Sequence, residues 1–200
     1  ERTFPIGDQS VFVRELILSG ELGTQIWDAS FVMFRYMETD LDFWKGKRIL
    51  ELGSGTGILG IGAAKIGAAE VIITDLPQLV GLMEENIRMN EVTNCRAMAL
   101  TWGDDPAPFN PPFDVILIAD VITELYSDHF PKLVQTIKDM SDTNTRIVLA
   151  FEKRMRNKEE TFFKLLLDND FTHTVVEGAY KWDPTYDSET RMTLYEIRRK

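Results

Sequence analysis

The sequence predicts an α/β protein built on a doubly wound, mostly parallel sheet of seven strands. Short apolar runs alternate with segments of helical periodicity across residues 48–167, and this alternation is typical of parallel strands joined by crossover helices. The first apolar run stops at a glycine-rich loop, as buried parallel strands often do. The last two strand-like runs have no long helix between them, so we expect an antiparallel pair at the C-terminus.

Seven runs have the length and apolar character of strands. The five central runs are 48–52, 70–74, 96–100, 113–119 and 146–151, and the C-terminal pair is 172–180 and 192–198. We expect helices at 58–66, 79–89, 128–140 and 159–167. In the second of these, Val80, Met83 and Ile87 repeat at helical spacing, and charged residues fall on the opposite face. Two polar loops, 104–112 and 183–189, complete the order.

Length and composition favour one domain. The chain has 200 residues, of which 44% are hydrophobic, and this is enough for a substantial core without disulfides or metals. We therefore expect a single domain over residues 1–200. The apolar stretch 58–69 is shorter than the roughly 18 residues that a membrane span requires, so we expect no membrane partner.

The cysteine and histidine content and the net charge indicate which metal sites, compartments and partners are to be expected. Cys95 is the only cysteine, and His129 and His173 lie far apart in the sequence, so an ordinary zinc site is not expected. A chain without internal disulfides suits a reducing compartment, here the cytoplasm or the nucleus. The net charge of −10 argues against nucleic acid as a partner. The basic stretch 153–158 is interpreted as the solvent-exposed beginning of a helix.

Three glycines follow the first central strand at the place where open parallel sheets bind ligands. Gly53, Gly55 and Gly57 would let an adenosine-bearing ligand approach the backbone without Cβ collisions. Asp75 lies 22 residues after Gly53, at the expected end of the next strand. An acid at that position can accept hydrogen bonds from both hydroxyls of a ribose.

The glycines fit two cofactor patterns. Gly55, Gly57 and Gly60 match the G-x-G-x-x-G pattern of nicotinamide enzymes, although a lone match is weak evidence. Glu51 precedes Gly53 by two residues and completes Glu-x-Gly-x-Gly-x-Gly, which is more specific to S-adenosylmethionine-dependent methyltransferases. We favour the methyltransferase interpretation, and a glycine turn without a ligand is the main alternative.

Five motifs together resemble the seven-strand, non-histone protein lysine methyltransferases. They are GTQIWDA at 23–29, ILELGSGTG at 49–57, ITDLP at 73–77, LTWG at 100–103 and IAD at 118–120. The resemblance covers nearly the whole chain and implies the Rossmann-like methyltransferase sheet. The family includes enzymes that modify heat-shock chaperones, valosin-containing protein and translation elongation factors.

The resemblance also implies roles for individual residues. Trp27 would lie over S-adenosylmethionine, residues 53–55 would approach its amino acid portion, and Asp75 would bind the ribose. Trp102 and Ala119 would flank the adenine. The full expected cofactor-binding set is Trp27, Glu51, Gly53, Ser54, Gly55, Asp75, Leu76, Trp102 and Ala119. Residues 1–45 would be an N-terminal extension that packs on this cofactor site.

One family motif is altered. The family usually has Asp-x-x-Tyr after its fourth strand, whereas this sequence has Asp120-Val121-Ile122-Thr123. Threonine cannot supply an aromatic wall for an ammonium group, so either another residue such as Tyr126 replaces the tyrosine or the acceptor differs. Asp120 remains the expected catalytic residue, because its carboxylate could orient an amine and balance positive charge. A helix N-cap or a cofactor contact is the alternative role for Asp120.

These observations give one main hypothesis and two alternatives. The main hypothesis is a monomeric protein-lysine N-methyltransferase that acts on a cytosolic chaperone or translation factor. The first alternative is a methyltransferase for a small molecule or another side chain, and the second is a binding module that has kept cofactor affinity without transfer. Surface loops such as 5–21 and 180–191 would decide the acceptor.

Overall fold

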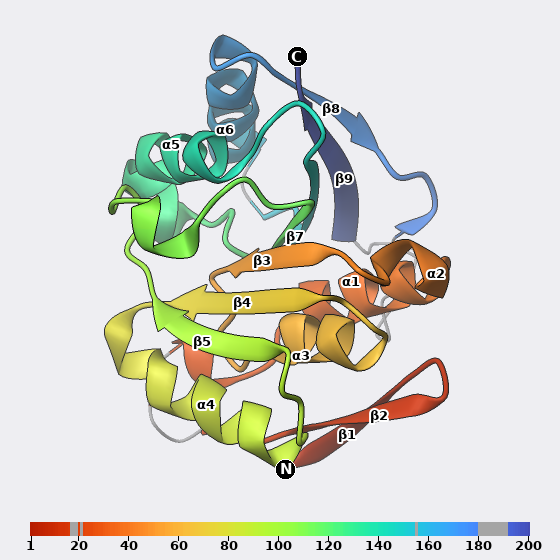
Figure 1. Cartoon of the computed structure of the whole chain (residues 1–200). Helices are drawn as coiled ribbons and strands as arrows, with labels where there is room; N and C mark the ends of the chain where they lie inside the picture. Colours follow the sequence, from red (N-terminus) through yellow and green to blue (C-terminus); the bar gives the residue numbers. More distant parts are fainter. Residues whose placement is uncertain (17–19, 21, 155, 180–191) are drawn as a thin grey trace.

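The computed structural model describes residues 1–16, 20, 22–154, 156–179 and 192–200. In these residues the main sheet has seven strands in the order β5-β4-β3-β6-β7-β9-β8 (Figure 1). They are β3 (Arg48–Leu52), β4 (Glu70–Asp75), β5 (Cys95–Ala99), β6 (Val115–Ala119), β7 (Arg146–Glu152), β8 (Phe171–Val175) and β9 (Met192–Arg199). Strands β3 to β7 pair in parallel, and β9 is antiparallel to both β7 and β8. The predicted fold class is confirmed.

The strand order reverses at β3. From β3 the chain moves outward to β4 and β5, returns to form β6 on the other side of β3, and continues to β7. Open α/β sheets bind their ligands beyond the carboxyl ends of the strands at such a reversal. The residues that follow β3 and β6 are Gly53 and Asp120, so the sheet brings these two positions to the same crevice.

Helices cover both faces of the sheet, because its central strands are apolar on both sides. One face packs against α1 (Asp28–Glu38), α3 (Ile58–Lys65) and α4 (Val80–Met89), and the other packs against α5 (Phe130–Met140) and α6 (Arg156–Asp168). Consecutive residues of β3 show the alternation. Ile49 belongs to a buried cluster with α1 and α3, whereas Leu50 belongs to a second cluster with α5 and α6.

The described residues before β3 contain more regular secondary structure than the sequence indicates. The expected surface loop 5–21 is wrong for its first part, because β1 (Arg2–Ile6) and β2 (Gln9–Val13) form an antiparallel hairpin. Val11 and Val13 alternate with exposed residues and are fully buried. The chain continues through the short 3-10 helix η2 (Leu22–Thr24) to α1 and α2 (Leu41–Trp44).

Asn86 of α4 and Asn90, the residue that follows α4, bind the hairpin and the glycine loop. The Asn90 side-chain oxygen accepts a hydrogen bond from the Phe12 amide at 2.9 Å, and its amide donates to the Phe12 carbonyl at 2.6 Å. Asn86 is fully buried and donates to the Thr56 carbonyl in the glycine loop at 2.8 Å. These two side chains therefore take the place of a neighbouring strand at the edge of β2.

The predicted element boundaries mostly agree with the structure. Strand 48–52 is matched residue for residue, whereas the helix expected at 128–140 begins at Phe130, because residues 124–129 form the 3-10 helix η5 (Glu124–His129). The strand expected at 172–180 ends at Val175 and is followed by a turn in which Gly178 has a φ of 79°. Tyr180 and the polar loop 183–189 lie outside the described residues.

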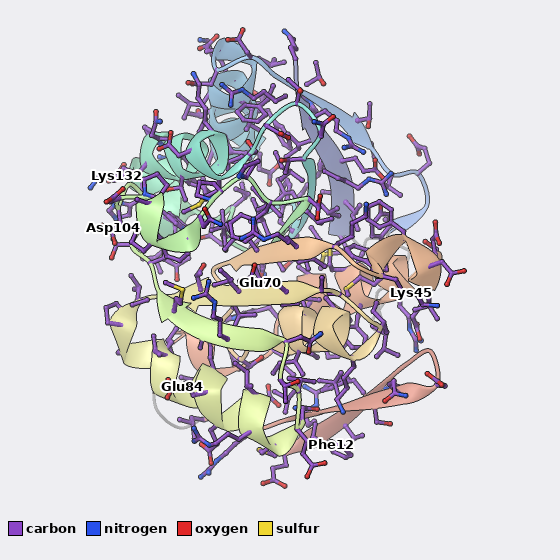
Figure 2. All side chains as sticks on the ribbon, viewed as in Figure 1. Phe12, Lys45, Glu70, Glu84, Asp104 and Lys132 are labelled. Carbon is purple, nitrogen blue, oxygen red and sulfur yellow. The ribbon has the colours of Figure 1, made fainter. Side chains whose placement is uncertain are left out.

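Charged side chains cover the outside of the molecule. The labelled side chains of Lys45, Glu84 and Asp104 are exposed and point away from the ribbon (Figure 2). Within the described part of the chain, none of the helices has both the length and the apolar character that crossing a membrane demands.

Candidate functional site

The loop after β3 adopts a backbone conformation that favours glycine. Gly53 has a φ of 69° and Gly55 a φ of 54°, in the left-handed region that other residues rarely adopt. A Cβ added to Gly55 would lie 2.7 Å from the Gly23 carbonyl oxygen, and a Cβ added to Gly53 would lie 2.8 Å from Val121 Cγ1. Glycine is therefore required here for two reasons, which are the left-handed turn and the close approach of Gly23 and Val121 to the loop.

Two buried polar residues hold the glycine loop in place. The Ser54 hydroxyl donates to the Glu51 carbonyl at 3.2 Å and accepts from the Thr74 amide at 2.9 Å. The Glu51 carboxyl group accepts from the Gly60 amide of α3 at 2.9 Å. Burial raises the pKa of Glu51 to about 8, so the group is mostly protonated at neutral pH. These residues fix the position of the loop relative to β4 and α3.

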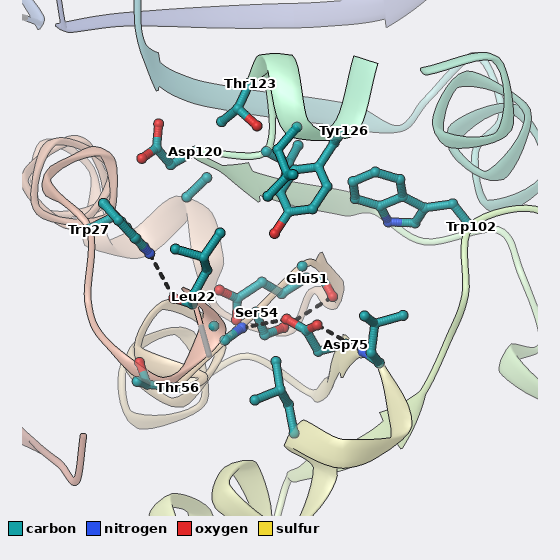
Figure 3. Close-up of a pocket in the computed structure, with 18 of the residues that line it drawn as sticks. Leu22, Trp27, Glu51, Ser54, Thr56, Asp75, Trp102, Asp120, Thr123 and Tyr126 are labelled. Carbon is teal, nitrogen blue, oxygen red and sulfur yellow. Dashed lines mark hydrogen bonds between the residues drawn. The ribbon is translucent and has the colours of Figure 1, made fainter. Parts of the chain in front are cut away.

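Asp75 ends β4 and faces the glycine loop. Its two carboxylate oxygens accept hydrogen bonds from the Gly55 and Leu76 amides, each at 2.8 Å (Figure 3). Burial raises the pKa of Asp75, and these two hydrogen bonds oppose that effect. Because a carboxylate can accept about four hydrogen bonds, Asp75 keeps acceptor capacity for a further donor such as a diol.

A cavity of about 730 Å³ lies beyond the carboxyl ends of β3, β4 and β6. Its volume is typical of small-molecule sites. The cavity brings together all ten residues that the sequence analysis proposes for the site, and each of them lines it. These residues are Trp27, Glu51, Gly53, Ser54, Gly55, Asp75, Leu76, Trp102, Ala119 and Asp120.

Aromatic residues from three segments line this cavity. Trp27 lies just before α1, and its indole nitrogen donates to the Leu22 carbonyl at 3.0 Å. Trp102 follows β5 and packs edge-to-face on Tyr126, with ring centroids 5.8 Å apart. The Tyr126 hydroxyl points toward Glu51 and Asp75 (Figure 3). Burial, followed by the charges of Asp75 and Asp120, raises the pKa of Tyr126.

Asp120 immediately follows β6 and is held by an arginine. Its φ of 54° is uncommon for a residue other than glycine, and its amide donates to the Ala150 carbonyl at 2.8 Å. Arg154 donates to both carboxylate oxygens of Asp120, at 3.1 and 2.9 Å. The Asp120 side chain is only 5% exposed, whereas the Arg154 side chain is 35% exposed, so the carboxylate is withdrawn from water and the arginine reaches it from the rim of the cavity.

Thr123 stands where the resemblance predicts a tyrosine. Its hydroxyl is buried, and within the described residues it has no hydrogen-bond partner. Figure 3 shows Thr123 and Asp120 across the cavity from Asp75. His129 and Lys132 also line the cavity. The wall that follows β6 therefore presents polar groups that the glycine loop does not use.

Residues 8–169 match the model of a family described as lysine methyltransferase. The chain belongs to the lysine methyltransferase family. It is 36% identical over 181 residues to EEF1A lysine methyltransferase 3 of Mus musculus, covering 90% of this chain and 73% of that protein. It is 31% identical over 203 residues to protein N-lysine methyltransferase METTL21A of Mus musculus, covering 99% and 87%. The resemblance found in the five motifs is confirmed.

Solved structures share the fold at lower identity. The ribosomal protein L11 methylase of Lactobacillus delbrueckii subsp. bulgaricus has a TM-score of 0.60 at 20% identity, with 86% of this chain and 77% of that chain covered. Magnesium protoporphyrin IX methyltransferase of Synechocystis PCC 6803, solved with bound S-adenosylmethionine, has the same score and identity, with 86% and 78% covered. These neighbours show the methyltransferase fold. The chain is an enzyme that uses S-adenosylmethionine, as its family does.

The cavity fits this cofactor on the evidence of its own residues. The loop at Gly53 and Gly55 leaves space that a Cβ would fill, so a ligand can lie against the backbone. Asp75 has acceptor capacity for ribose hydroxyls, and Trp102 and Leu76 supply apolar surface beside it. Among the described residues, no group of three or more His, Cys, Asp or Glu is placed to hold a metal.

Arg154 belongs to the site although its sequence context does not indicate this. The stretch 153–158 was interpreted as a solvated helix start, but α6 begins at Arg156 and the Arg154 side chain lines the cavity. No local pattern could have shown this, because its partner Asp120 lies 34 residues earlier. The unpartnered Thr123 hydroxyl was also missed, since burial of a single atom depends on tertiary packing.

Proposed function

We propose that this methyltransferase adds methyl groups to a lysine side chain of a protein, and that EEF1A is the acceptor to test first. The family match and the relative named EEF1A lysine methyltransferase 3 support a protein acceptor. The observation that carries the proposal is the position of Asp120, whose buried carboxylate lines the same cavity as the glycine loop. A carboxylate at this position can orient an amine through hydrogen bonds.

We further propose how the cofactor is bound. Asp75 holds the ribose hydroxyls, and the backbone at 53–55 lies against the amino acid portion. Leu76, Trp102 and Ala119 flank the adenine, and Trp27 lies over the cofactor. Glu51 and Ser54 act through the loop, because their polar atoms are bonded to Gly60, Thr74 and the loop itself.

The side of the cavity formed by Asp120, Thr123, Tyr126 and Arg154, here called the acceptor wall, must favour a neutral amine. S-adenosylmethionine supplies a methyl carbon on a sulfonium, so transfer forms a nitrogen–carbon bond and leaves the neutral thioether S-adenosylhomocysteine. A lysine has a pKa of about 10.4 in water, and it must first lose one proton, which passes to solvent. Asp120 orients the amine, and the Tyr126 ring supplies an aromatic wall.

We also propose a domain organisation and a location for the enzyme. Residues 1–200 form one domain, and residues 1–45 act as an extension that closes the cofactor site, since Leu22, Gly23 and Trp27 line the cavity. We propose that the enzyme is a cytoplasmic monomer, with the nucleus as the second location. The net charge of −10 favours a basic protein surface over nucleic acid or an anionic membrane as the partner.

The decisive experiment incubates the purified chain with radiolabelled S-adenosylmethionine and EEF1A, followed by mass spectrometry of the labelled protein. A methylated lysine on EEF1A is the expected result. The Asp120→Ala variant should keep its affinity for the cofactor in calorimetry and lose most of the transfer, because Asp120 lies on the acceptor side. Label on a different protein from a cytosolic lysate would replace EEF1A as the acceptor.

A second candidate function follows from Thr123. The family tyrosine is absent, and a small-molecule acceptor would not need the aromatic wall that it provides. Label confined to small metabolites would favour this candidate over a protein acceptor. Cofactor binding without any labelled product would identify a binding module that has lost transfer.

A further inference from the structure

Arg154 is the charged residue of the acceptor wall to which the proposed chemistry gives no role. It lies two residues beyond β7 and links two distant parts of the chain. Its guanidinium is bidentate on Asp120 after β6, and its Cζ atom lies 5.8 Å from the ring centroid of Trp27 before α1. Glu152 accepts from the Nε atom of Arg154 at 2.8 Å. The guanidinium is therefore held from three sides.

A lone carboxylate beside the acceptor would have two opposing effects. It would orient the amine through hydrogen bonds, but its negative charge would also stabilise the ammonium form, which cannot attack a methyl group. The Asp120 side chain is 5% exposed, so water screens this charge only weakly. An arginine stays protonated at every pH at which such an enzyme works, and the pair of Asp120 and Arg154 carries no net charge.

We infer that Arg154 is a positioning residue that fixes the Asp120 carboxylate and cancels its charge, so that the acceptor lysine can lose its proton near neutral pH. This inference rests on the proposed function, because it concerns a lysine amine in this cavity. The fork of Arg154 bonds to both oxygens of Asp120 and so sets the orientation of the carboxylate. The same contact decides which protonation state of the amine the wall favours.

Other titratable groups face the same space. They are Glu51 from β3, Asp75 from β4, Tyr126 and His129 from η5, Lys132 from α5, and Glu152, which contacts Arg154. Each of them contributes to the electrostatic potential at the acceptor. Arg154→Gln also takes the cationic partner from Glu152, and the double variant with Asp120→Asn shares that change. The difference between Arg154→Gln and the double variant therefore reports on the charge of Asp120.

The first test is the pH profile of kcat/KM for methylation of EEF1A. In Arg154→Gln a buried negative charge loses its partner, so we expect the acid limb to move up by about one pH unit and activity near neutral pH to fall about tenfold. Most of the lost activity should be recovered at about pH 9. Arg154→Lys keeps the charge and should keep the limb close to its wild-type position. In Asp120→Asn/Arg154→Gln both charges are gone. The acid limb of this double variant should return to its wild-type position, even if its kcat/KM stays low at every pH.

A matched control changes the neighbouring cation. Lys153→Gln removes the same charge one residue earlier, where the ammonium lies 5.9 Å from the Tyr195 ring centroid, and Lys153 does not line the cavity. Its pH profile should equal that of wild type. An unshifted acid limb in Arg154→Gln, or an equal loss at every pH, overturns the inference. A large loss of cofactor affinity in calorimetry overturns it as well, because Arg154 would then act on the cofactor side.

A second test needs no acceptor and so separates this inference from the proposed function. Thermal melting of wild type, Asp120→Asn, Arg154→Gln and the double variant forms a double-mutant cycle. We expect each single variant to melt at a lower temperature and the double variant to lose less than the sum of the two. Additive losses would show that the two residues are not coupled, and they would overturn the inference for any acceptor. If wild type fails to methylate EEF1A while the cycle is non-additive, the choice of acceptor is wrong and the pairing of Asp120 with Arg154 stands.

Discussion

The wall of the cavity formed by β3 and β4 is shaped by backbone, whereas the wall that follows β6 and β7 is shaped by charged side chains. On the first wall, Ser54 donates to the Glu51 carbonyl, Asp75 accepts from the Gly55 amide, and the buried Glu51 carboxyl group accepts from the Gly60 amide of α3. On the second, Asp120 and Arg154 hold each other across 34 residues of sequence, and the Thr123 hydroxyl has no partner among the described residues. A backbone wall suits a cofactor common to many enzymes, and a side-chain wall can change with the acceptor.

The strongest test of the backbone wall is Gly55→Ala. The added Cβ would lie 2.7 Å from the Gly23 carbonyl oxygen, at a residue whose φ is 54°, so the loop must move away from Asp75. We expect cofactor affinity in calorimetry to fall about 100-fold or more, which is about 2.7 kcal/mol. The melting temperature should also fall, because a left-handed alanine costs about 1 kcal/mol.

A matched control exists on α4. Gly81 has an ordinary φ and open space within 4 Å of an added Cβ, so Gly81→Ala should bind the cofactor as wild type does and melt slightly higher. Unchanged cofactor affinity in Gly55→Ala would show that the loop tolerates displacement. The wall could not then be described as a fixed backbone surface.

Asp75→Ala tests the one side chain on which the backbone wall depends for ribose recognition. The variant loses acceptors for the hydroxyls and also releases the Gly55 and Leu76 amides. Hydrogen bonds to a charged group contribute about 1.5–3 kcal/mol, so we expect the dissociation constant to rise about 10-fold to 100-fold. Equal affinity in wild type and variant would refute the ribose assignment.

The same contrast explains what the sequence could predict. The glycine loop and Asp75 are adjacent to their own strands, so a motif and a spacing of 22 residues were enough to place them. The central strands were equally clear, because strands buried on both faces are continuously apolar. Arg154 could not be placed, since its partner is distant in sequence and its local surroundings are those of a solvated basic stretch. The hairpin of β1 and β2 was missed because its edge is bound by the side chains of Asn86 and Asn90.

Glu51 should make the stability of the protein depend on pH. Its pKa is raised from 4.5 to about 8 by burial, so its contribution to stability is complete below about pH 4.5 and is lost as the pH rises through about 8. Wild type should therefore lose stability relative to Glu51→Gln between these values, by up to about 1.4 kcal/mol per pH unit. Melting temperatures of both proteins across this range measure the difference. Parallel curves would mean that Glu51 is not held protonated by the fold.

Thr123→Val is the smallest change and tests the side-chain wall where this chain departs from its family. The two side chains have nearly the same shape, and the variant removes a buried hydroxyl without a partner among the described residues. We expect the melting temperature to rise slightly, by the equivalent of about 1 kcal/mol or less, because that hydroxyl is no longer buried unpaired. If the hydroxyl contacts the acceptor amine, kcat/KM for the acceptor should fall a few-fold while cofactor affinity stays constant. A stabilised variant with unchanged kcat/KM would place the acceptor amine away from Thr123 and leave Asp120 and Tyr126 as the contacts that replace the family tyrosine.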